Sequence, residues 1–389
     1  MTTAARLLDV LRDQRQELLG FLERLALAES PSTNRPAQRP AFDQLAEALE
    51  RLQFAPRLLP GRASGGQLYA RPQERNRARP IQLLLGHIDT VWPQGTLADM
   101  PVRLEGDRLR GPGVYDMKGG LTQIVFALRA LRELDLEMPV TPVVFVNSDE
   151  EIGSRESTRH IRRLARMADR AYVLEPSLGL EGRLKTARKG IGRFTLTVKG
   201  KAAHAGLNPE AGASAILELS HQIQRLFALN DPAAGVSVNV GMIDGGINPN
   251  VVAPESRAVI DVRVPTHEAA RRVEQAIRAL TPVTPGVSLK VEGAIGRPPM
   301  EHTPAGDSLW QAARTRGLEL GLQLEQASAG GGSDGNTTSQ YTATLDGLGP
   351  VGDGAHAHHE YVVVDKLIER AALLALLLLE PPLRGSLAS

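Results

Sequence analysis

The chain has 389 residues, 42% of them hydrophobic and 23% charged, with a formal net charge of +1 at pH 7. Such a chain is long enough for two domains with a substantial core, and its composition is typical of a globular protein. The near-neutral charge gives no reason to expect binding to nucleic acid or to an anionic membrane. The absence of cysteine excludes disulfides, thiolate metal ligands and a cysteine nucleophile, and it fits a reducing compartment.

Neither end of the sequence has the pattern of a targeting or membrane-spanning segment. The first residues are charged throughout, which is not typical of a signal peptide. The most apolar stretch, residues 371–379, is far shorter than the ~20 residues needed to span a bilayer. We therefore expect this stretch to form a buried helix and the protein to be cytoplasmic.

Apolar runs alternate with helical patterns in the first half of the chain. The runs at residues 81–85, 143–146 and 171–174 are typical of strands buried on both faces, as in a parallel sheet. A short strand is expected over residues 67–70, and helical spacing predicts helices over residues 7–27, 40–52, 121–131 and 158–166. This alternation predicts an α/β domain with a mostly parallel sheet.

Residues able to bind a metal or transfer a proton follow each of the three apolar runs. His87 and Asp89 follow the first, Glu150 and Glu151 the second, and Glu175 the third. In an open α/β sheet, chemistry collects beyond the carboxyl ends of the strands. On a tight loop the side chains of two adjacent acids diverge, so one acid can bind a cation while the other faces a water molecule.

A further acid, Asp116, lies in the motif GPGVYDMKGG at residues 111–120, near the start of a predicted helix. Aspartate is among the preferred helix N-caps. Capping alone does not explain the rigid glycine-rich segments on both sides of it, so we treat Asp116 as a candidate site residue.

The pattern changes after residue 190. Strands are expected over residues 194–198, 236–243, 257–264 and 288–292, and helices over residues 213–229 and 267–280. The order β-α-β-β-α-β is the ferredoxin-like arrangement. We infer an inserted lid domain, residues 191–304, between the two parts of a catalytic domain, residues 1–190 and 305–389. Hinges for lid closure are expected at residues 190–192 and 298–304.

Helical spacing resumes after the lid, over residues 308–320 and 362–379. Between these helices lie the loop GGGSDGN at residues 330–336, which is too rich in glycine for regular structure, and the histidines His356, His358 and His359.

The candidate residues form a plausible ligand set for two metal ions: His87, Asp116, Glu151, Glu175 and His356. Mixed imidazole and carboxylate ligands suit zinc and, less specifically, cobalt or manganese. Two ions fit if Asp116 bridges them, and a zinc pair activates water and polarises a carbonyl. Glu150 is then free to act as the general base, and Asp89 to orient His87.

The motifs GHIDT, GPGVYDMKGG, NSDEEIGS, LEPS, GKAAHAG and DGLGPVGDGAH occur in the order seen in a family of di-zinc hydrolases. That family includes glutamate carboxypeptidase, acetylornithine deacetylase, succinyl-diaminopimelate desuccinylase, aminoacylase and carnosinase-type dipeptidases. The chain resembles this family from about residue 81 to residue 362, lid included.

The resemblance implies a role for each matching residue. His87 and Glu175 would hold one zinc ion, Glu151 and His356 the other, with Asp116 bridging and Glu150 as the base. His356 is preferred as the last ligand because it follows Gly354 and Ala355 and lies four residues before Glu360; His358 is the alternative.

The resemblance also implies substrate contacts from the lid. His204 resembles a residue that reaches the partner's active site in family dimers and stabilises the developing oxyanion, so a homodimer through the lid is expected. Asn250 and Arg263 resemble residues that bind the substrate's carboxylate. Gly332 belongs to the glycine-rich loop that resembles the family's substrate loop.

The sequence thus predicts a zinc-dependent exopeptidase that acts on a small-molecule or short-peptide substrate. It would release a C-terminal amino acid, most plausibly glutamate, because GHIDTVWPQGT most resembles glutamate carboxypeptidase. The alternative within the family is an N-acyl-amino-acid deacylase or dipeptidase. A catalytically silent binding relative would have lost a ligand or the base, whereas all these positions are intact.

Overall fold

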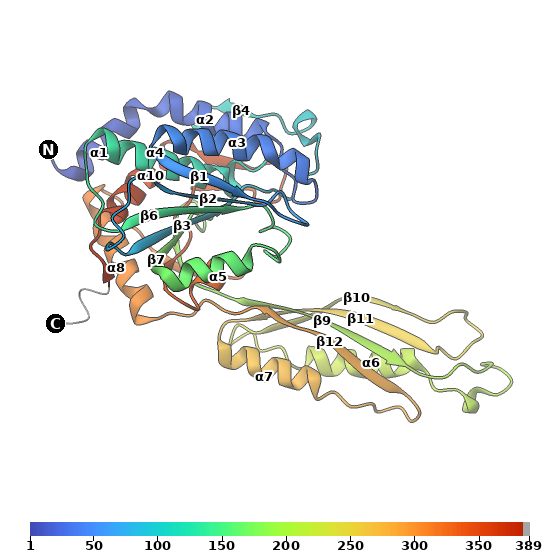
Figure 1. The fold of residues 1–389 in the computed structure, drawn as a ribbon. Coiled ribbons are helices and arrows are strands. Elements are labelled where there is room, and N and C mark those ends of the chain that lie inside the picture. Colours follow the sequence, from blue (N-terminus) through green and yellow to red (C-terminus); the bar gives the residue numbers. More distant parts are fainter. Residues whose placement is uncertain (384–389) are drawn as a thin grey trace. The chain divides into compact units, whose positions relative to one another are not determined.

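The computed structural model describes residues 1–383. The chain divides into two compact units (Figure 1). The first unit comprises Met1–Thr186, His302–Ser328 and Ser333–Ser389, and the second comprises Ala187–Glu301 and Ala329–Gly332. Among the helices of residues 1–383, none combines the length and the apolarity that crossing a membrane requires.

The first unit is built on a central sheet with the strand order β1-β2-β6-β3-β7-β14. Strands β6, β3, β7 and β14 are mutually parallel, whereas β1 and β2 run antiparallel at one edge. The strands are β1 (Phe54–Leu59), β2 (Gln67–Pro72), β3 (Ile81–His87), β6 (Thr141–Asn147), β7 (Ala168–Val173) and β14 (Ala343–Leu345). The predicted mostly parallel α/β sheet is confirmed.

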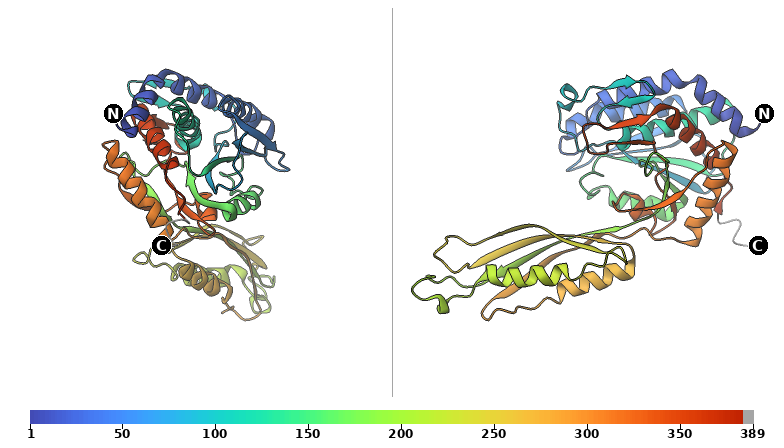
Figure 2. Two further views of the ribbon diagram at one scale, coloured as in Figure 1. Left: turned by 60° about the vertical axis from the view of Figure 1, so that its left-hand side comes forward. Right: turned by 180° about the vertical axis from the view of Figure 1, so that it is seen from behind.

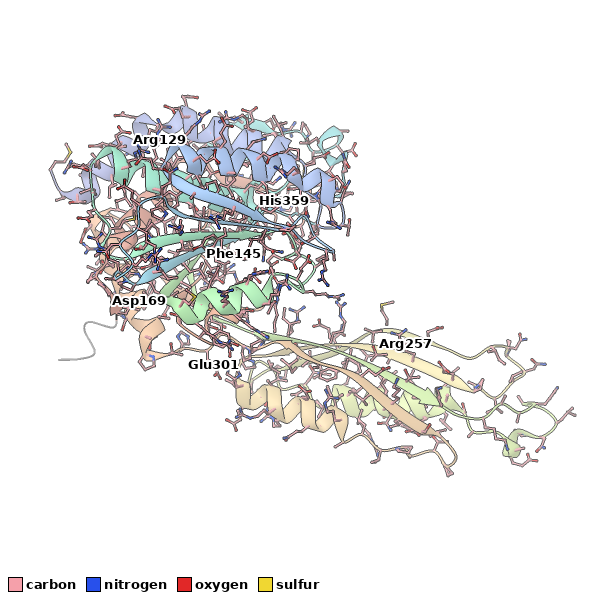
Figure 3. The ribbon with its side chains drawn as sticks, viewed as in Figure 1. Arg129, Phe145, Asp169, Arg257, Glu301 and His359 are labelled. Atoms are coloured by element: carbon pink, nitrogen blue, oxygen red, sulfur yellow. The ribbon has the colours of Figure 1, made fainter. Side chains whose placement is uncertain are left out.

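Helices cover both faces of this sheet. They are α1 (Thr3–Asp13), α2 (Arg15–Leu27), α3 (Arg35–Arg51), α4 (Gly119–Glu133), α5 (Thr158–Met167), α8 (Pro304–Glu319), α9 (Gly335–Thr338) and α10 (Val364–Leu378). The N-terminal helices and α10 pack together over one face, and the view from behind in Figure 2 shows them on the same side of the sheet. Helix α5 covers the other face. Phe145 of β6 is fully buried there, with its ring 6.3 Å from that of His160 (Figure 3).

Burial on both faces explains why β3 and β6 are mostly apolar, with no polar–apolar alternation. All residues of both strands are buried. Leu84 and Val144 contribute to the core under the N-terminal helices, and the alternate residues Leu83 and Val143 contribute to the core under α5. Each such side chain, when fully buried, contributes about 1.5–3 kcal/mol.

Several predicted bounds in the first unit differ from the structure. The expected helix over residues 7–27 is two helices that meet at Gln14, whose side-chain amide donates to Glu133 across 2.6 Å. Helix α3 begins five residues before Pro40 and contains that proline. Strand β1 was not predicted. Helix α9 begins inside the segment expected to be irregular, at Gly335.

A small antiparallel sheet joins two distant segments of the first unit, with the order β15-β16-β5-β4. Its strands are β4 (Arg103–Glu105), β5 (Arg108–Arg110), β15 (Gly352–Asp353) and β16 (Tyr361–Val363). Strand β16 explains why the closing helix begins at Val364 rather than at the predicted residue 362. The pairing of Tyr361 with Arg110 places the histidine-rich segment beside the motif that carries Asp116. Two further strands, β8 (Leu184–Arg188) and β13 (Gln326–Ala329), pair with each other.

The second unit has the predicted ferredoxin-like order. Its elements are β9 (Gly190–Lys199), α6 (Ala215–Phe227), β10 (Ser237–Gly245), β11 (Glu255–Val264), α7 (His267–Arg278) and β12 (Ser288–Arg297). They form a four-stranded sheet, β10-β11-β9-β12, in which all neighbours are antiparallel. Buried residues of β9 and β11, among them Phe194 and Ile260, pack against the two helices. Strand β12 extends five residues beyond its predicted end.

Candidate metal centre

The register of the parallel strands brings the candidate residues together. His87, the last residue of β3, is paired with Asn147, the last residue of β6. The backbone N–H of Ile88 donates to the Asn147 carbonyl across 2.8 Å, and that of Leu174 donates to the Leu85 carbonyl across 3.0 Å. The residues that follow these strands therefore emerge at one edge of the sheet, as the sequence predicts for parallel strands.

His87 is buried and lies between two carboxylates. Its Nε2 atom is 3.3 Å from Oδ1 of Asp116 and 3.5 Å from Oε1 of Glu175. Burial opposes protonation of His87, but the contacts with Asp116, Asp89 and Glu175 outweigh it and raise the pKa of the imidazole well above its usual value.

His356 lies between Asp116 and a different glutamate. Its Nε2 atom is 3.1 Å from Oε2 of Glu151 and 3.5 Å from Oδ2 of Asp116. The alternative residue, His358, instead lies against Trp92, with ring centroids 5.2 Å apart and the ring planes tilted by 59°. The two oxygens of Asp116 therefore face two different histidines.

Asp116 is held in a tight turn before helix α4. The turn spans Val114–Lys118, and the Asp116–Met117 peptide bond is cis. Burial opposes ionisation of Asp116, yet the two histidines outweigh it and hold the pKa of its carboxyl below the usual range. Asp116 is therefore the residue of this group best suited to stay charged.

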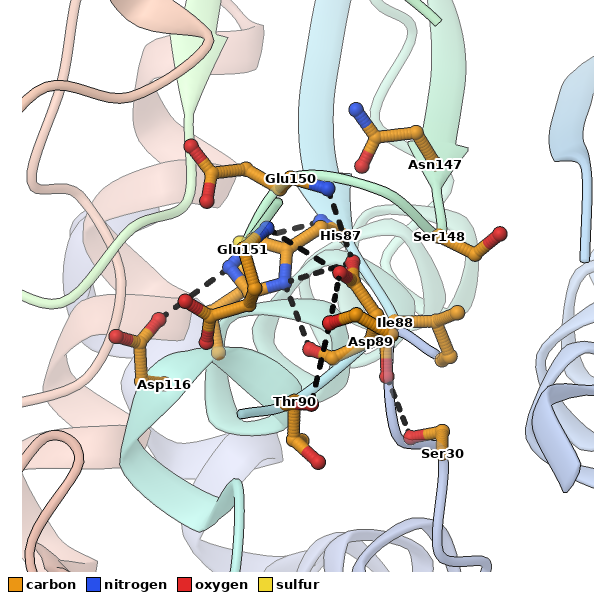
Figure 4. Close-up of polar contacts among 12 residues, drawn as sticks. Ser30, His87, Ile88, Asp89, Thr90, Asp116, Asn147, Ser148, Glu150 and Glu151 are labelled. Atoms are coloured by element: carbon orange, nitrogen blue, oxygen red, sulfur yellow. Dashed lines mark hydrogen bonds and ion pairs between the residues drawn. The ribbon is translucent and has the colours of Figure 1, made fainter. Parts of the chain in front are cut away.

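Glu150 and Glu151 leave their loop in different directions, as predicted for adjacent acids (Figure 4). A carboxylate oxygen of Glu151 groups with His87 and Asp116, whereas one of Glu150 groups with His87 and Glu175, with all ligand atoms of each group within 4.8 Å. Burial raises the pKa of Glu151 to about 8, and contacts with Asp116 and then Glu151 raise the pKa of His356 to about 10.

Asp89 is fully buried, and it contacts both His87, as predicted, and the loop that carries Glu150 and Glu151. Nδ1 of His87 is 2.9 Å from the backbone carbonyl oxygen of Asp89 and 3.4 Å from its carboxylate. The same carboxylate accepts hydrogen bonds from the backbone N–H groups of Glu150 and Glu151, each at 3.2 Å, and from the hydroxyl of Ser32 at 2.7 Å. Asp89 thus ties the loop of the paired acids to the end of β3 (Figure 4).

Three buried atoms at this site lack a hydrogen-bond partner among residues 1–383: Nε2 of His87, Oδ1 of Asp116 and Oε1 of Glu151. Buried polar atoms are normally satisfied, and buried carboxylates are costly unless they are paired with cations. The ligands of a tetrahedral zinc ion, bound at about 2.0–2.2 Å, lie roughly 3.3 Å apart. The separations of 3.1 to 3.5 Å around both histidines match this value, so the residues fit a pair of metal ions.

In the second unit, His204 and Asn250 lie on adjacent segments. The backbone N–H of Ala205 donates to the Asn250 carbonyl across 2.9 Å, and His204 forms an isolated antiparallel β-bridge with Val251. Nδ1 of the exposed His204 accepts from the N–H groups of Gly206 and Leu207 at 3.1 and 3.2 Å. The proton of the neutral imidazole therefore resides on Nε2.

Arg263 lies on β11, opposite Ile191 of β9, and is not beside His204 or Asn250. Its guanidinium makes a two-point contact with Asp261, with Nε to Oδ1 at 2.8 Å and Nη2 to Oδ2 at 3.2 Å. Gly332 lies in the segment Ala329–Gly332, which also belongs to the second unit. There the carbonyl oxygen of Gly331 accepts a hydrogen bond from Arg188 across 3.1 Å.

The sequence reasoning missed Glu360, which it used only to locate His356. This carboxylate is buried and accepts hydrogen bonds from Trp92, Gly113, Tyr115 and Asp116. Burial raises the pKa of Glu360 to about 7. The only sequence feature that could have identified Glu360 is its position as an acid directly before an apolar strand. Its hydrogen-bond partners are remote in sequence.

The fold and the cluster define an α/β domain with a carboxylate- and histidine-rich candidate metal centre. The Peptidase family M20/M25/M40 matches residues 83–380. The chain is 31% identical over 305 residues to carboxypeptidase G2 of Pseudomonas sp. (strain RS-16), covering 77% of this chain and 73% of that protein. The chain belongs to this family, and it is a peptidase or amidohydrolase.

One further relative is similar in sequence, and two solved structures share the fold. The chain is 29% identical over 313 residues to succinyl-diaminopimelate desuccinylase of Xanthomonas campestris pv. campestris, covering 76% of this chain and 82% of that protein. Among solved structures, aminopeptidase PepT from Bacillus cereus has the same fold, with a TM-score of 0.75, 20% identity and coverage of 94% of this chain and 98% of that one. A dinuclear metal-binding peptidase of family M20 from Bacillus subtilis has a TM-score of 0.68 at 15% identity, covering 95% of this chain and 98% of that one.

Proposed function

We propose that the protein is a di-zinc exopeptidase that hydrolyses the amide bond to a C-terminal amino acid, most plausibly glutamate, of N-acyl or peptidyl substrates. The observation that carries the proposal is the position of Asp116. Its two carboxylate oxygens lie 3.3 Å from His87 and 3.5 Å from His356, and each histidine has its own glutamate. Such a group suits two ions that share one carboxylate.

Each ion has its own ligands in this proposal. His87 and Glu175 would hold one ion, Glu151 and His356 would hold the other, and Asp116 would contribute a ligand to both. When bound, the ions supply Lewis-acid chemistry, because they polarise the scissile carbonyl and lower the pKa of water. Cobalt or manganese could occupy the same ligands.

Glu150 acts as the general base in this proposal. Its carboxylate takes a proton from the attacking water as the hydroxyl oxygen bonds to the carbonyl carbon. When the C–N bond breaks, Glu150 gives that proton to the leaving amine nitrogen. Asp89 keeps the base in place, because its carboxylate accepts hydrogen bonds from the backbone N–H groups of Glu150 and Glu151.

His204 serves as the oxyanion donor in this proposal. Backbone N–H groups occupy its Nδ1, so Nε2 is left to donate to an oxyanion. Asn250 and Arg263 bind the substrate's carboxylate, with the pair between Arg263 and Asp261 holding the guanidinium in place. Backbone N–H groups near Gly332 complete the substrate site.

The separation of these residues within the second unit supports a homodimer. The strand from Glu255 to Arg263 alone spans about 26 Å, at about 3.3 Å per residue. His204 and Asn250 lie beyond the Glu255 end, because the ladder continues through the hydrogen bonds of Gly200 with Pro254 and of Val252 with Ala203. A small substrate cannot contact both ends, so one site must use residues from two chains.

The surface of the second unit supports the same dimer. Strand β10 is an edge strand, and Met242 and Ile243 on it are 69% and 67% exposed. Helix α6 adds exposed apolar side chains at Ile216 and Leu217. An exposed apolar edge is a template for pairing with another strand. We propose that β10 and α6 meet their counterparts in a second copy of the chain, and that the enzyme works in the cytoplasm.

The substrate class is tested with a panel of N-blocked dipeptides and N-acetyl amino acids. The proposal predicts that a C-terminal glutamate is released faster than any apolar residue, and that a peptidyl group is preferred to a simple acetyl group. Preference for the acetyl group would instead assign the protein to the deacylase branch, the alternative function for the same metal centre.

A further inference from the structure

Glu360 lies at the meeting point of two segments that are remote in sequence. It is 1% exposed, and it stands four residues after His356 and directly before strand β16. Its own backbone is fixed, because its N–H donates to the Ala357 carbonyl across 3.0 Å and its carbonyl accepts from the N–H of Gly111 across 3.3 Å.

Each carboxylate oxygen of Glu360 accepts two hydrogen bonds. Oε1 accepts hydrogen bonds from the backbone N–H groups of Tyr115 at 2.9 Å and Asp116 at 3.0 Å. Oε2 accepts from the backbone N–H of Gly113 at 3.0 Å and from the indole N–H of Trp92 at 2.9 Å. Four donors converge on one acceptor-only group, an arrangement that only a carboxylate satisfies.

Three of these donors belong to the turn that carries Asp116. Without Glu360, the N–H groups of Gly113, Tyr115 and Asp116 would be buried without partners, which is costly. The side-chain oxygens of Asp116 face His87 and His356 only while this turn keeps its conformation. Any shift of the turn would move both oxygens together.

We propose that Glu360 is a positioning residue that fixes the Gly113–Asp116 turn so that Asp116 can serve two metal ions at once. The inference rests on the proposed metal centre and adds to it a residue that acts through the ligand Asp116. One short segment then supplies both a ligand, His356, and the carboxylate that places the shared ligand. Binding at either ion position therefore depends on Glu360 through the position of Asp116.

The test compares metal binding by full-length variants. In Glu360→Gln, one amide nitrogen replaces an acceptor and faces two N–H donors. We expect the affinity for zinc, measured by calorimetry on metal-free protein, to fall roughly 10- to 100-fold, as for other residues that orient ligands. Cobalt-substituted protein should show an altered visible absorption spectrum. Glu47→Gln, on the exposed side of α3, is the matched control and should bind zinc like the wild type.

A double variant separates positioning from a folding defect. Trp92→Phe removes one donor and should weaken zinc binding only slightly. In Trp92→Phe/Glu360→Gln, the amide nitrogen meets one donor fewer, so part of the lost affinity should return. Equal zinc affinity and an unchanged cobalt spectrum in Glu360→Gln would overturn the positioning role and leave the proposed function intact. Failure of the wild type to bind zinc would overturn the metal centre itself.

Discussion

Nε2 of His356 lies 3.1 Å from Oε2 of Glu151, whereas a carboxylate oxygen of the adjacent Glu150 groups with His87 and Glu175. Under the proposed function, this difference gives two neighbouring acids different roles. Glu150→Gln should keep both metal ions and lose roughly 10²–10⁴-fold in kcat, because only the proton transfer is removed. Glu151→Gln should lose bound metal. Elemental analysis and initial rates on both variants measure this, and the reverse pattern would exchange base and ligand.

Two inactive variants should regain catalytic activity when mixed if His204 acts on the substrate bound by the partner subunit. His204→Ala lacks the oxyanion donor and Glu150→Gln lacks the base. In a mixed dimer, one site combines Glu150 from the first variant with His204 from the second. We expect activity to reappear when the two are unfolded and refolded together, up to about one quarter of the wild-type rate, because half of the dimers are mixed and each has one intact site.

The matched control for this experiment is a mixture of His204→Ala with wild-type-like Glu210→Gln, which changes an exposed acid of the same unit. Half of the sites in that mixture are intact whether or not subunits exchange, so its rate calibrates the recovery of active protein after refolding, and exchange itself is measured with differently tagged chains. Persistent inactivity of the first mixture, in spite of proven exchange, would contradict a role for His204 across the dimer. Full activity of a monomer would contradict it equally.

Arg263 should control recognition of the substrate's free carboxylate. Arg263→Gln should raise KM for a substrate with a C-terminal carboxylate by about 10- to 100-fold, because a hydrogen-bonded charge contributes about 1.5–3 kcal/mol. The corresponding C-terminal amide should be cleaved as poorly by the variant as by the wild type. Steady-state kinetics on the two substrates measure the difference, and an equal loss on both would assign Arg263 a structural role through Asp261.

Glu218 should make the second unit sensitive to acid. It is fully buried and accepts hydrogen bonds from the N–H groups of Val283 and Thr284 and from Gln222. Burial opposes its ionisation, but these donors outweigh it and hold the pKa of Glu218 below its usual value. The folded-state pKa is therefore lower than the unfolded one, so this stabilisation is complete above about pH 4.3 and is lost as the pH falls through the folded-state pKa.

Glu218→Gln should accordingly destabilise the second unit by about 1–3 kcal/mol at neutral pH. The difference from the wild type should shrink once the pH falls below about 4.3. Hydrogen–deuterium exchange of residues 281–285 measures this local stability, with Glu210→Gln as the exposed control. A difference that stays constant with pH would assign the effect to packing rather than to the charge.

The central features of the fold were predictable because they depend on local patterns. Largely apolar runs within β3, β6 and β7 identified these strands, since strands buried on both faces show no polar–apolar alternation. Strand β1 was not predicted because its sequence, FAPRLL, contains a proline and an arginine and because it is an edge strand. The break at Gln14 has neither glycine nor proline to mark it, and its side chain bonds to a residue far along the chain.

The clustering of the candidate ligands was predictable for a related reason: the carboxyl ends of parallel strands meet at one edge of the sheet. His87 and Glu175 were brought together by strand register alone. Glu360 was not predictable in this way, because three of its four hydrogen-bond donors are backbone N–H groups, which have no sequence signature. The pairing of Arg263 with Asp261 was visible only as two charged residues on one face of a strand.

The most direct test of the account is a zinc titration of metal-free protein, with release of C-terminal glutamate from an N-blocked dipeptide followed at each step. The account predicts no hydrolysis without metal, binding of two zinc ions per chain, and recovery of the rate as the ions bind. Hydrolysis of the same substrate by metal-free protein at the full rate would contradict it.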